Sequence, residues 1–146
     1  KTSPVHASYV NGAATHVLDF EPMWLPPTHA VSPVVPAALA LAEAHGIGGR
    51  EVVTAVAKGM EIQGRVQFAA NQFKPEKLRF HPPGIAGVLG AAVTAGHLLG
   101  LDSQKLTYAL GIAFYSGTRG PIHHVEYGIT TRGTRLTIGL SGGRSA

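Results

Sequence analysis

The sequence contains no cysteine among its 146 residues. A disulfide framework, a thiolate zinc site and a cysteine-ligated iron–sulfur cluster are therefore excluded for this chain. Charged residues are also scarce, at 14% of the chain, where a typical soluble domain carries about 25%. So low a charged fraction in a short chain indicates extra buried surface, against a partner or against further polypeptide.

Other common signatures are missing as well. The formal net charge of +4 comes from twelve scattered Lys and Arg against eight Asp and Glu, so we expect no nucleic-acid partner. The sequence has no HExxH pair, Walker A loop, GxGxxG loop or GxSxG elbow. Chemistry carried by this chain should therefore be acid–base chemistry on an anion, without a metal ion or a redox cofactor.

The ends of the sequence do not look like natural termini. The first residue is Lys1 rather than Met, and Ser145 and Ala146 follow a glycine-rich stretch without an obvious stop. We therefore expect the chain to be part of a longer protein. No basic start precedes a suitable apolar stretch, so we expect no secretory signal peptide.

The apolar residues, 45% of the chain counting Ala, recur mostly at helical spacing. This pattern predicts an all-α, multi-helix bundle. The expected helices cover about residues 3–20, 32–45, 50–73, 82–99 and 103–116, and residues 117–146 stay unassigned. Many glycines and alanines on the expected helices predict close approach of their backbones.

Turn residues mark several of the expected helix boundaries. Gly46 and Gly100 each precede an apolar residue, a pattern typical of a left-handed helix C-terminus. Ser32 followed by proline predicts a helix start, and Asp102 or Ser103 predicts another. The chain is therefore expected to alternate between helices and short turns.

The longest apolar run extends from Gly84 to Leu101, and at about 18 residues it is near the lower limit for a membrane span. His97 inside the run, the prolines directly before it and its many glycines favour a buried central helix of a bundle. A membrane hairpin formed with the next helix is the less favoured alternative.

The first polar cluster surrounds a proline-rich loop and contains Asp19, Glu21, Thr28 and His29. The loop should be ordered but not helical, because its prolines cannot continue a helix. A carboxylate at a helix C-terminus is unfavourable unless it has a partner, and Asp19 with His29 would form a pair suited to general acid–base work. In the alternative interpretation, Asp19 bonds only loop amides and His29 is solvated.

The second cluster, Lys77, Arg79 and His81, precedes the helix expected from Pro82. Cations near a helix N-terminus suit a carboxylate or phosphate ligand, although an ordinary basic loop would look the same. The third cluster is Glu61, Gln63 and Arg65, where the i,i+4 spacing of the charged pair predicts a surface salt bridge.

Several strings resemble the MmgE/PrpD family in order and spacing over roughly residues 3–116. They include Val10-Asn11-Gly12, Leu18-Asp19-Phe20, Pro27-Thr28-His29, Gly59-Met60-Glu61-Ile62-Gln63-Gly64-Arg65 and Arg79-Phe80-His81-Pro82-Pro83. The family contains 2-methylcitrate dehydratase, cis-aconitate decarboxylase and related lyases of small polycarboxylates. The resemblance implies a large all-α domain with a smaller α/β lid, usually in a homodimer, and no metal or other cofactor.

By this resemblance, residues 1–146 are a partial helical domain without the lid, and the protein is a lyase of a small di- or tricarboxylate, a dehydratase or a decarboxylase. It also implies a cytoplasmic location, or a mitochondrial one in a eukaryote, and no membrane partner. The alternative is a degenerate or truncated member that acts as a helical interaction module. We expect the fragment to be inactive alone.

The resemblance also implies roles for single residues. Asp19, His29 and His81 would be catalytic, and Thr28, Arg79 and Arg132 would bind substrate. Some positions depart from the family pattern. Glu21-Pro22-Met23 stands where the family has Asp-Asp-Thr, and Arg132 or Arg135 replaces a Lys. Arginine binds carboxylates but is a poor proton donor, so the substrate could differ from that of the decarboxylase branch.

Overall fold

The computed structural model describes residues 2–18, 20–24, 28–72 and 82–117. In chain order its elements are α1 (Pro4–His16), β1 (Met23–Trp24), β2 (Thr28–His29), α2 (Val31–His45), α3 (Gly49–Ala69), η2 (Pro83–Gly87), α4 (Val88–Leu98) and α5 (Ser103–Ser116). The predicted all-α class is confirmed. The strands form a small antiparallel ribbon in which Met23 pairs with His29 and Trp24 with Thr28.

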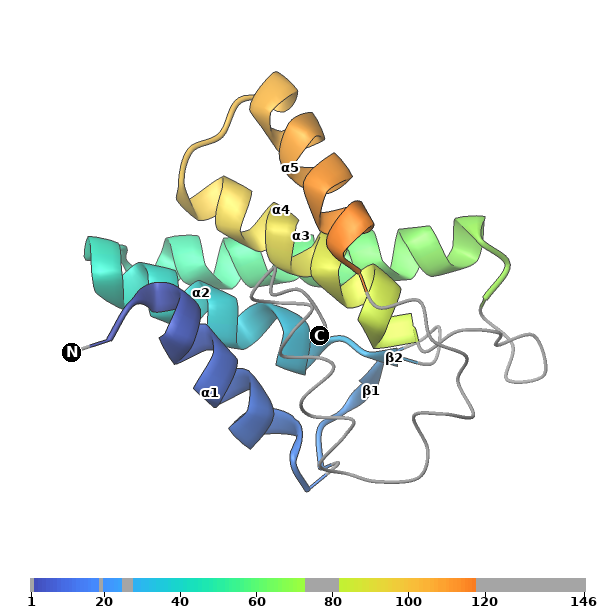
Figure 1. The fold of residues 1–146 in the computed structure, drawn as a ribbon, viewed down its shortest axis with the longest axis horizontal. Helices are drawn as coiled ribbons and strands as arrows, with labels where there is room; N and C mark the ends of the chain where they lie inside the picture. Colours follow the sequence, from blue (N-terminus) through green and yellow to red (C-terminus); the bar gives the residue numbers. More distant parts are fainter. Residues whose placement is uncertain (1, 19, 25–27, 73–81, 118–146) are drawn as a thin grey trace.

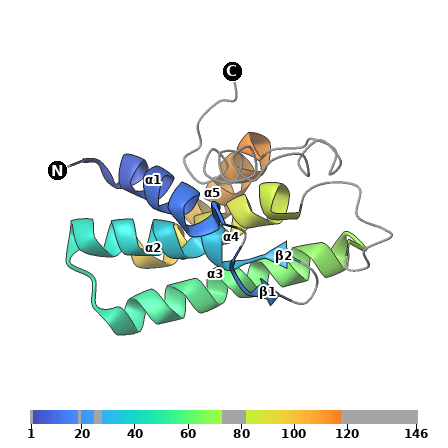
Figure 2. The same cartoon turned by 90° about the horizontal axis from the view of Figure 1, so that it is seen from below.

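Helix α4 lies at the centre of the arrangement and contacts α2, α3 and α5, while α1 packs on α2 (Figure 1). The view from below shows α3 running beneath α2, with the β1–β2 ribbon at the end of α2 where that helix begins (Figure 2). The buried apolar side chains are mostly small. They are Ala30, Val34, Ala37, Ala38, Ala40, Ala42, Ala55, Ala86, Val88, Leu89 and Ala91. Small side chains let the helices pack closely, as the sequence predicts.

The predicted helix ends are largely confirmed. Gly46 and Gly100 adopt left-handed conformations with φ of 65° and 64°. In the turn after α2, the Ile47 amide donates to the Ala42 carbonyl at 3.0 Å, the bond expected of a glycine-terminated helix. Asp102 is the N-cap residue directly before α5, and its side chain accepts a hydrogen bond from the Lys105 amide at 2.8 Å.

Two expected helices end earlier in the structure. Helix α1 ends at His16 rather than near residue 20, and α3 ends at Ala69 rather than near residue 73. The chain turns after α1, where the His16 side chain contacts Glu21 at 2.6 Å. After α3, Asn71 adopts a left-handed backbone with φ of 57°, which a continuing helix does not allow.

The apolar run that starts at Gly84 also differs from a single straight helix. It begins with the π-helical turn η2 and continues as α4, which has 11 residues. Prolines at 82 and 83 have no amide hydrogen to donate.

In the described part of the chain, no helix combines the length and the apolar character that crossing a membrane requires. The central position of α4 and its buried residues match the predicted buried helix.

Candidate functional site

The structure describes only part of the site that the sequence predicts. Thr28 and His29 form β2, and Glu21 precedes β1. Asp19, Lys77, Arg79, His81 and Arg132 lie outside the described residues, so their roles stay predictions. The described site is therefore built around His29 and its neighbours.

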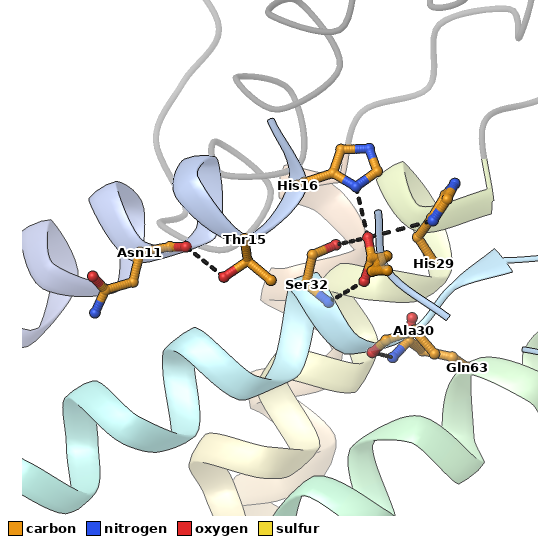
Figure 3. A network of polar contacts seen from close by, with 8 residues as sticks. Asn11, Thr15, His16, His29, Ala30, Ser32 and Gln63 are labelled. Carbon is orange, nitrogen blue, oxygen red and sulfur yellow. Dashed lines mark hydrogen bonds and ion pairs between the residues drawn. The ribbon is translucent and has the colours of Figure 1, made fainter. Parts of the chain in front are cut away.

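The carboxylate of Glu21 is the centre of a buried polar cluster with His16, His29 and Ser32, and these three partners are labelled in Figure 3. Its Oε1 atom accepts a hydrogen bond from the Ser32 hydroxyl at 2.6 Å, and its Oε2 atom accepts one from the Ser32 amide at 2.7 Å. The Nδ1 atom of His16 lies 2.6 Å from Oε1, and Nδ1 of His29 lies 3.4 Å from the same oxygen. One carboxylate thus faces two imidazoles and one hydroxyl.

Secondary structure positions each member of this cluster. His16 is the last residue of α1, His29 ends β2, and Ser32 is in the first turn of α2. The residue before α2, Ala30, has no side chain that could accept a hydrogen bond from the helix. Glu21 supplies the missing acceptor, because a carboxylate is favoured beside the free amides and positive dipole end of a helix.

The hydrogen bonds set the charge of Glu21. Burial by itself would raise the pKa of this carboxyl, but the hydrogen bonds from His16 and Ser32 outweigh it and hold the pKa below its ordinary value. Glu21 is therefore ionised at neutral pH.

His29 is the member of the cluster closest to the surface. Its side chain is 12% exposed, against 3% for Glu21 and 0% for His16. The two imidazole rings meet edge to face, with centroids 4.7 Å apart and planes at 70°. Thr28, the predicted substrate-binding residue next to it, is buried, and that role stays a prediction.

Gln63 supports the same region from α3. Its side chain is fully buried and donates hydrogen bonds to the carbonyl of Ala30 at 3.1 Å and to that of Gly59 at 3.3 Å. Glu61 and Arg65, its neighbours in the third sequence cluster, form the predicted surface salt bridge at 2.8 Å. The third sequence cluster therefore has two parts. Glu61 and Arg65 form a pair at the surface, and the buried Gln63 amide holds Ala30, the residue after His29.

A divalent cation is a second chemical possibility for this site. His16, Glu21 and His29 each offer one ligand atom, and these atoms lie within 4.8 Å of one another. Both oxygens of Glu21 already accept hydrogen bonds, and the His16 nitrogen that faces Oε1 is a donor to it. A cation would have to displace these bonds, so the arrangement fits a proton-sharing cluster better than a metal centre.

An apolar cavity of about 420 Å³ lies elsewhere, between α1, α2, α4 and α5. Among the residues that the structure describes, its wall includes Val5, Leu41, Val88 and Ile112 and no charged side chain. A polycarboxylate would lose its hydration there without gaining a partner. The polar cluster is therefore the better candidate site.

The sequence did not indicate two members of the cluster. His16 belonged to none of the three polar clusters, and Ser32 was expected only at a helix start. For His29, Asp19 was the expected carboxylate partner, whereas the carboxylate beside it in the described part of the chain is Glu21. One feature of the sequence could have indicated the pair. His16 stands at a helix C-terminus, where the helix dipole favours a histidine, and Glu21 follows it within five residues.

The geometry defines a class of domain: an all-helical unit with a buried carboxylate–imidazole cluster where its first two helices meet. Residues 1–123 match the MmgE/PrpD N-terminal domain, and the chain therefore belongs to the MmgE/PrpD family. This confirms the resemblance inferred from the sequence.

Two relatives define the similarity further. The chain is 41% identical over 114 residues to cis-aconitate decarboxylase of Homo sapiens and 40% identical over 114 residues to cis-aconitate decarboxylase of Mus musculus. Each alignment covers 75% of this chain, but only 24% of the human protein and 23% of the mouse protein. The chain thus spans about a quarter of the length of these relatives.

Proposed function

We propose that this chain is the N-terminal helical part of a cofactor-independent lyase that acts on a small di- or tricarboxylate such as cis-aconitate or 2-methylcitrate. Its family and the activity named for both relatives support a lyase. The observation that carries the proposal is the ionised, buried Glu21 beside the partly exposed imidazole of His29. An imidazole next to a fixed carboxylate is suited to moving protons near neutral pH.

The reaction would be a dehydration or a decarboxylation. In a dehydration, a base removes the proton α to a carboxylate, the carbon–oxygen bond breaks, and an acid protonates the leaving hydroxide to give water. In a decarboxylation, the bond from carbon to a carboxylate breaks, carbon dioxide leaves, and an acid protonates the carbon that keeps the electron pair. Both reactions need a group that accepts or donates a proton, and we assign this role to His29 and His81.

The substrate's carboxylates need cationic partners. We assign this role to Arg79 and Arg132, since a guanidinium binds a carboxylate through two parallel hydrogen bonds. Thr28 would contribute a hydroxyl to the same pocket, and Asp19 a carboxylate. We expect the remainder of the protein, and a second copy in a homodimer, to complete the pocket.

A second candidate is a non-catalytic member of the family that serves as a helical interaction module. Met23, which is 60% exposed, has no hydroxyl at a position where the family pattern has Thr. Exposed apolar side chains on α5, among them Tyr108, Ile112 and Tyr115, would offer a surface for a partner.

Turnover by the protein made from its full reading frame separates these candidates. The assay supplies cis-aconitate, 2-methylcitrate and related hydroxy and unsaturated acids, and it measures carbon dioxide release and the gain or loss of a double bond. We expect His29→Gln and His81→Gln to lower kcat by about 10²–10⁴-fold. His45→Gln changes an exposed histidine at the end of α2 and should leave kcat unchanged.

Two results would contradict the lyase proposal. One is full activity in both histidine variants. The other is a folded wild-type protein that turns over none of these acids, which would favour the interaction module.

A further inference from the structure

We propose that Glu21, held in place by Ser32 and His16, is the positioning residue that fixes the tautomer of His29. The Nδ1 atom of His29 carries the proton and faces the carboxylate, and Nε2 is the nitrogen that exchanges a proton with the substrate. The assignment of Nε2 to proton exchange rests on the proposed function, whereas the tautomer follows from the cluster alone.

The first argument is the chemistry of the facing atoms. An ionised carboxylate can only accept hydrogen bonds, while a neutral imidazole has one N–H and one lone pair. Nδ1 of His29 lies 3.4 Å from Oε1 of Glu21, so a lone pair on Nδ1 would face a negative charge at short range. The tautomer with hydrogen on Nδ1 replaces this repulsion by attraction. Figure 3 shows Nδ1 of His29 on the side of the dashed contact and the second ring nitrogen pointing away from it.

The second argument is that Glu21 cannot readily turn away. Its two oxygens are tied to the hydroxyl and the amide of Ser32 at 2.6 and 2.7 Å, and its side chain is 3% exposed. Because Ser32 belongs to the first turn of α2, the carboxylate is anchored to a helix rather than to a loop. A group held this way keeps its direction when the substrate enters.

The third argument concerns His16. It is fully buried and contacts the same Oε1 atom at 2.6 Å, and its ring meets that of His29 edge to face. His16 therefore restrains the carboxylate from one side and the ring of His29 from the other. A buried carboxylate that orients an imidazole in this way is a recurring arrangement in acid–base catalysis.

The charged surroundings of His29 are simple in the described part of the chain. Glu21 and His16 face it, while η2, which packs on β2, carries no titratable side chain. From α3 the neutral Gln63 approaches Ala30, and the first turn of α2 holds only uncharged residues. Glu21→Gln removes the negative charge among these described groups, so we expect it to change the titration of His29.

The test uses Glu21→Gln in the protein made from its full reading frame, labelled with ¹³C and ¹⁵N in histidine. The signals of His29 are assigned by comparison with His29→Gln, and the ¹³Cδ2 and ring ¹⁵N shifts report the tautomer. In the wild type we expect the Nδ1–H form. In Glu21→Gln we expect a mixture with the Nε2–H form, and protonation of His29 at a pH lower by about one unit or more.

Turnover gives a second readout. The acid limb of the pH–rate profile should move to lower pH in Glu21→Gln, while Glu21→Asp, which keeps the charge, should restore the wild-type position in part. Glu61→Gln is the matched control, because Glu61 is 56% exposed in a surface salt bridge. It should change neither the tautomer nor the profile.

An unchanged tautomer and an unchanged titration of His29 in Glu21→Gln would overturn the proposal. The same effects in Asp19→Asn instead would also overturn it and make Asp19 the orienting carboxylate. If Glu21→Gln does not fold, Ser32→Ala tests the same idea, since it removes the hydroxyl that anchors Oε1 of Glu21 and should give a mixture of the two His29 tautomers. The spectra decide the tautomer even if no acid is turned over, so failure of the lyase proposal would be recognised separately.

Discussion

Gly59 and Gly90 face each other where α3 crosses α4, and a Cβ atom on either residue would lie 2.7 Å from the carbonyl oxygen of the other. The two backbones therefore touch at a distance that only glycine permits. The hydroxyl of Thr94, one turn further along α4, donates to the Ala55 carbonyl on α3 at 3.2 Å. This crossing holds α3, and with it Gln63, against the centre of the bundle.

Gly90→Ala should destabilise the protein by about 2–3 kcal/mol, because the added methyl would press on the Gly59 carbonyl and on the buried Gln63 amide. The measurement is the urea midpoint of unfolding. Gly111→Ala is the control, since a Cβ at Gly111 in α5 meets nothing within 4 Å. It should be neutral or add up to about 1 kcal/mol. Equal effects of the two changes would contradict the backbone contact.

Gln63→Leu keeps the approximate size of the side chain but leaves the carbonyl of Ala30 without its donor. We expect a loss of about 1–3 kcal/mol in the free energy of unfolding. Turnover should fall as well, because Ala30 follows His29. Gln104→Leu is the matched control, since Gln104 is exposed in the first turn of α5. A loss in Gln63→Leu no larger than in Gln104→Leu would show that the bond to Ala30 contributes nothing.

Glu21→Gln should also change stability in a pH-dependent way. The pKa of Glu21 is lowered in the folded protein, so its ionised form stabilises the fold fully above the ordinary pKa of 4.5. That contribution is lost as the pH falls through the lowered value. We expect Glu21→Gln to cost about 1–3 kcal/mol at pH 7. Below pH 4.5 the difference from wild type should shrink.

Unfolding curves between neutral and acidic pH measure this difference. Glu61→Gln, in the exposed pair with Arg65, should cost less than about 1 kcal/mol and show no comparable dependence on pH. A difference between Glu21→Gln and wild type that stays constant into acid would contradict the role of the buried charge.

Local patterns in the sequence predicted most of the fold. Helical periodicity located every helix that the structure describes, and the glycines at 46 and 100 marked where two of them end. These features can be predicted from the sequence, because each depends on residues within one or two helical turns of one another. The early end of α1 could not be predicted in this way. It coincides with a contact between the side chains of His16 and Glu21, which forms only when the chain turns back after the helix.

The site was predicted less completely for the same reason. The sequence placed Glu21 in the same polar cluster as His29. It also predicted a carboxylate partner for His29, but named Asp19 for that role. Ser32 joins Glu21 across 11 residues, and Gln63 reaches Ala30 across 33. No periodicity or capping rule reports such distances, since the packing of α2 against α1 and α3 brings the partners together.

Gly46 allows the cost of backbone conformation to be measured without a steric contribution. Its φ is 65°, and a Cβ at this position would meet nothing within 4 Å. Gly46→Ala should therefore lower the free energy of unfolding by about 1–2 kcal/mol through the left-handed backbone alone. Gly49→Ala, at the start of α3, is the control. A Cβ there also meets nothing within 4 Å, and Gly49 has no positive φ, so this variant should be neutral or slightly stabilising.

Gly46→Asn should cost less than Gly46→Ala, because asparagine tolerates this conformation, as Asn71 does at φ of 57°. Equal urea midpoints for the two alanine variants would show that the left-handed turn relaxes at no cost.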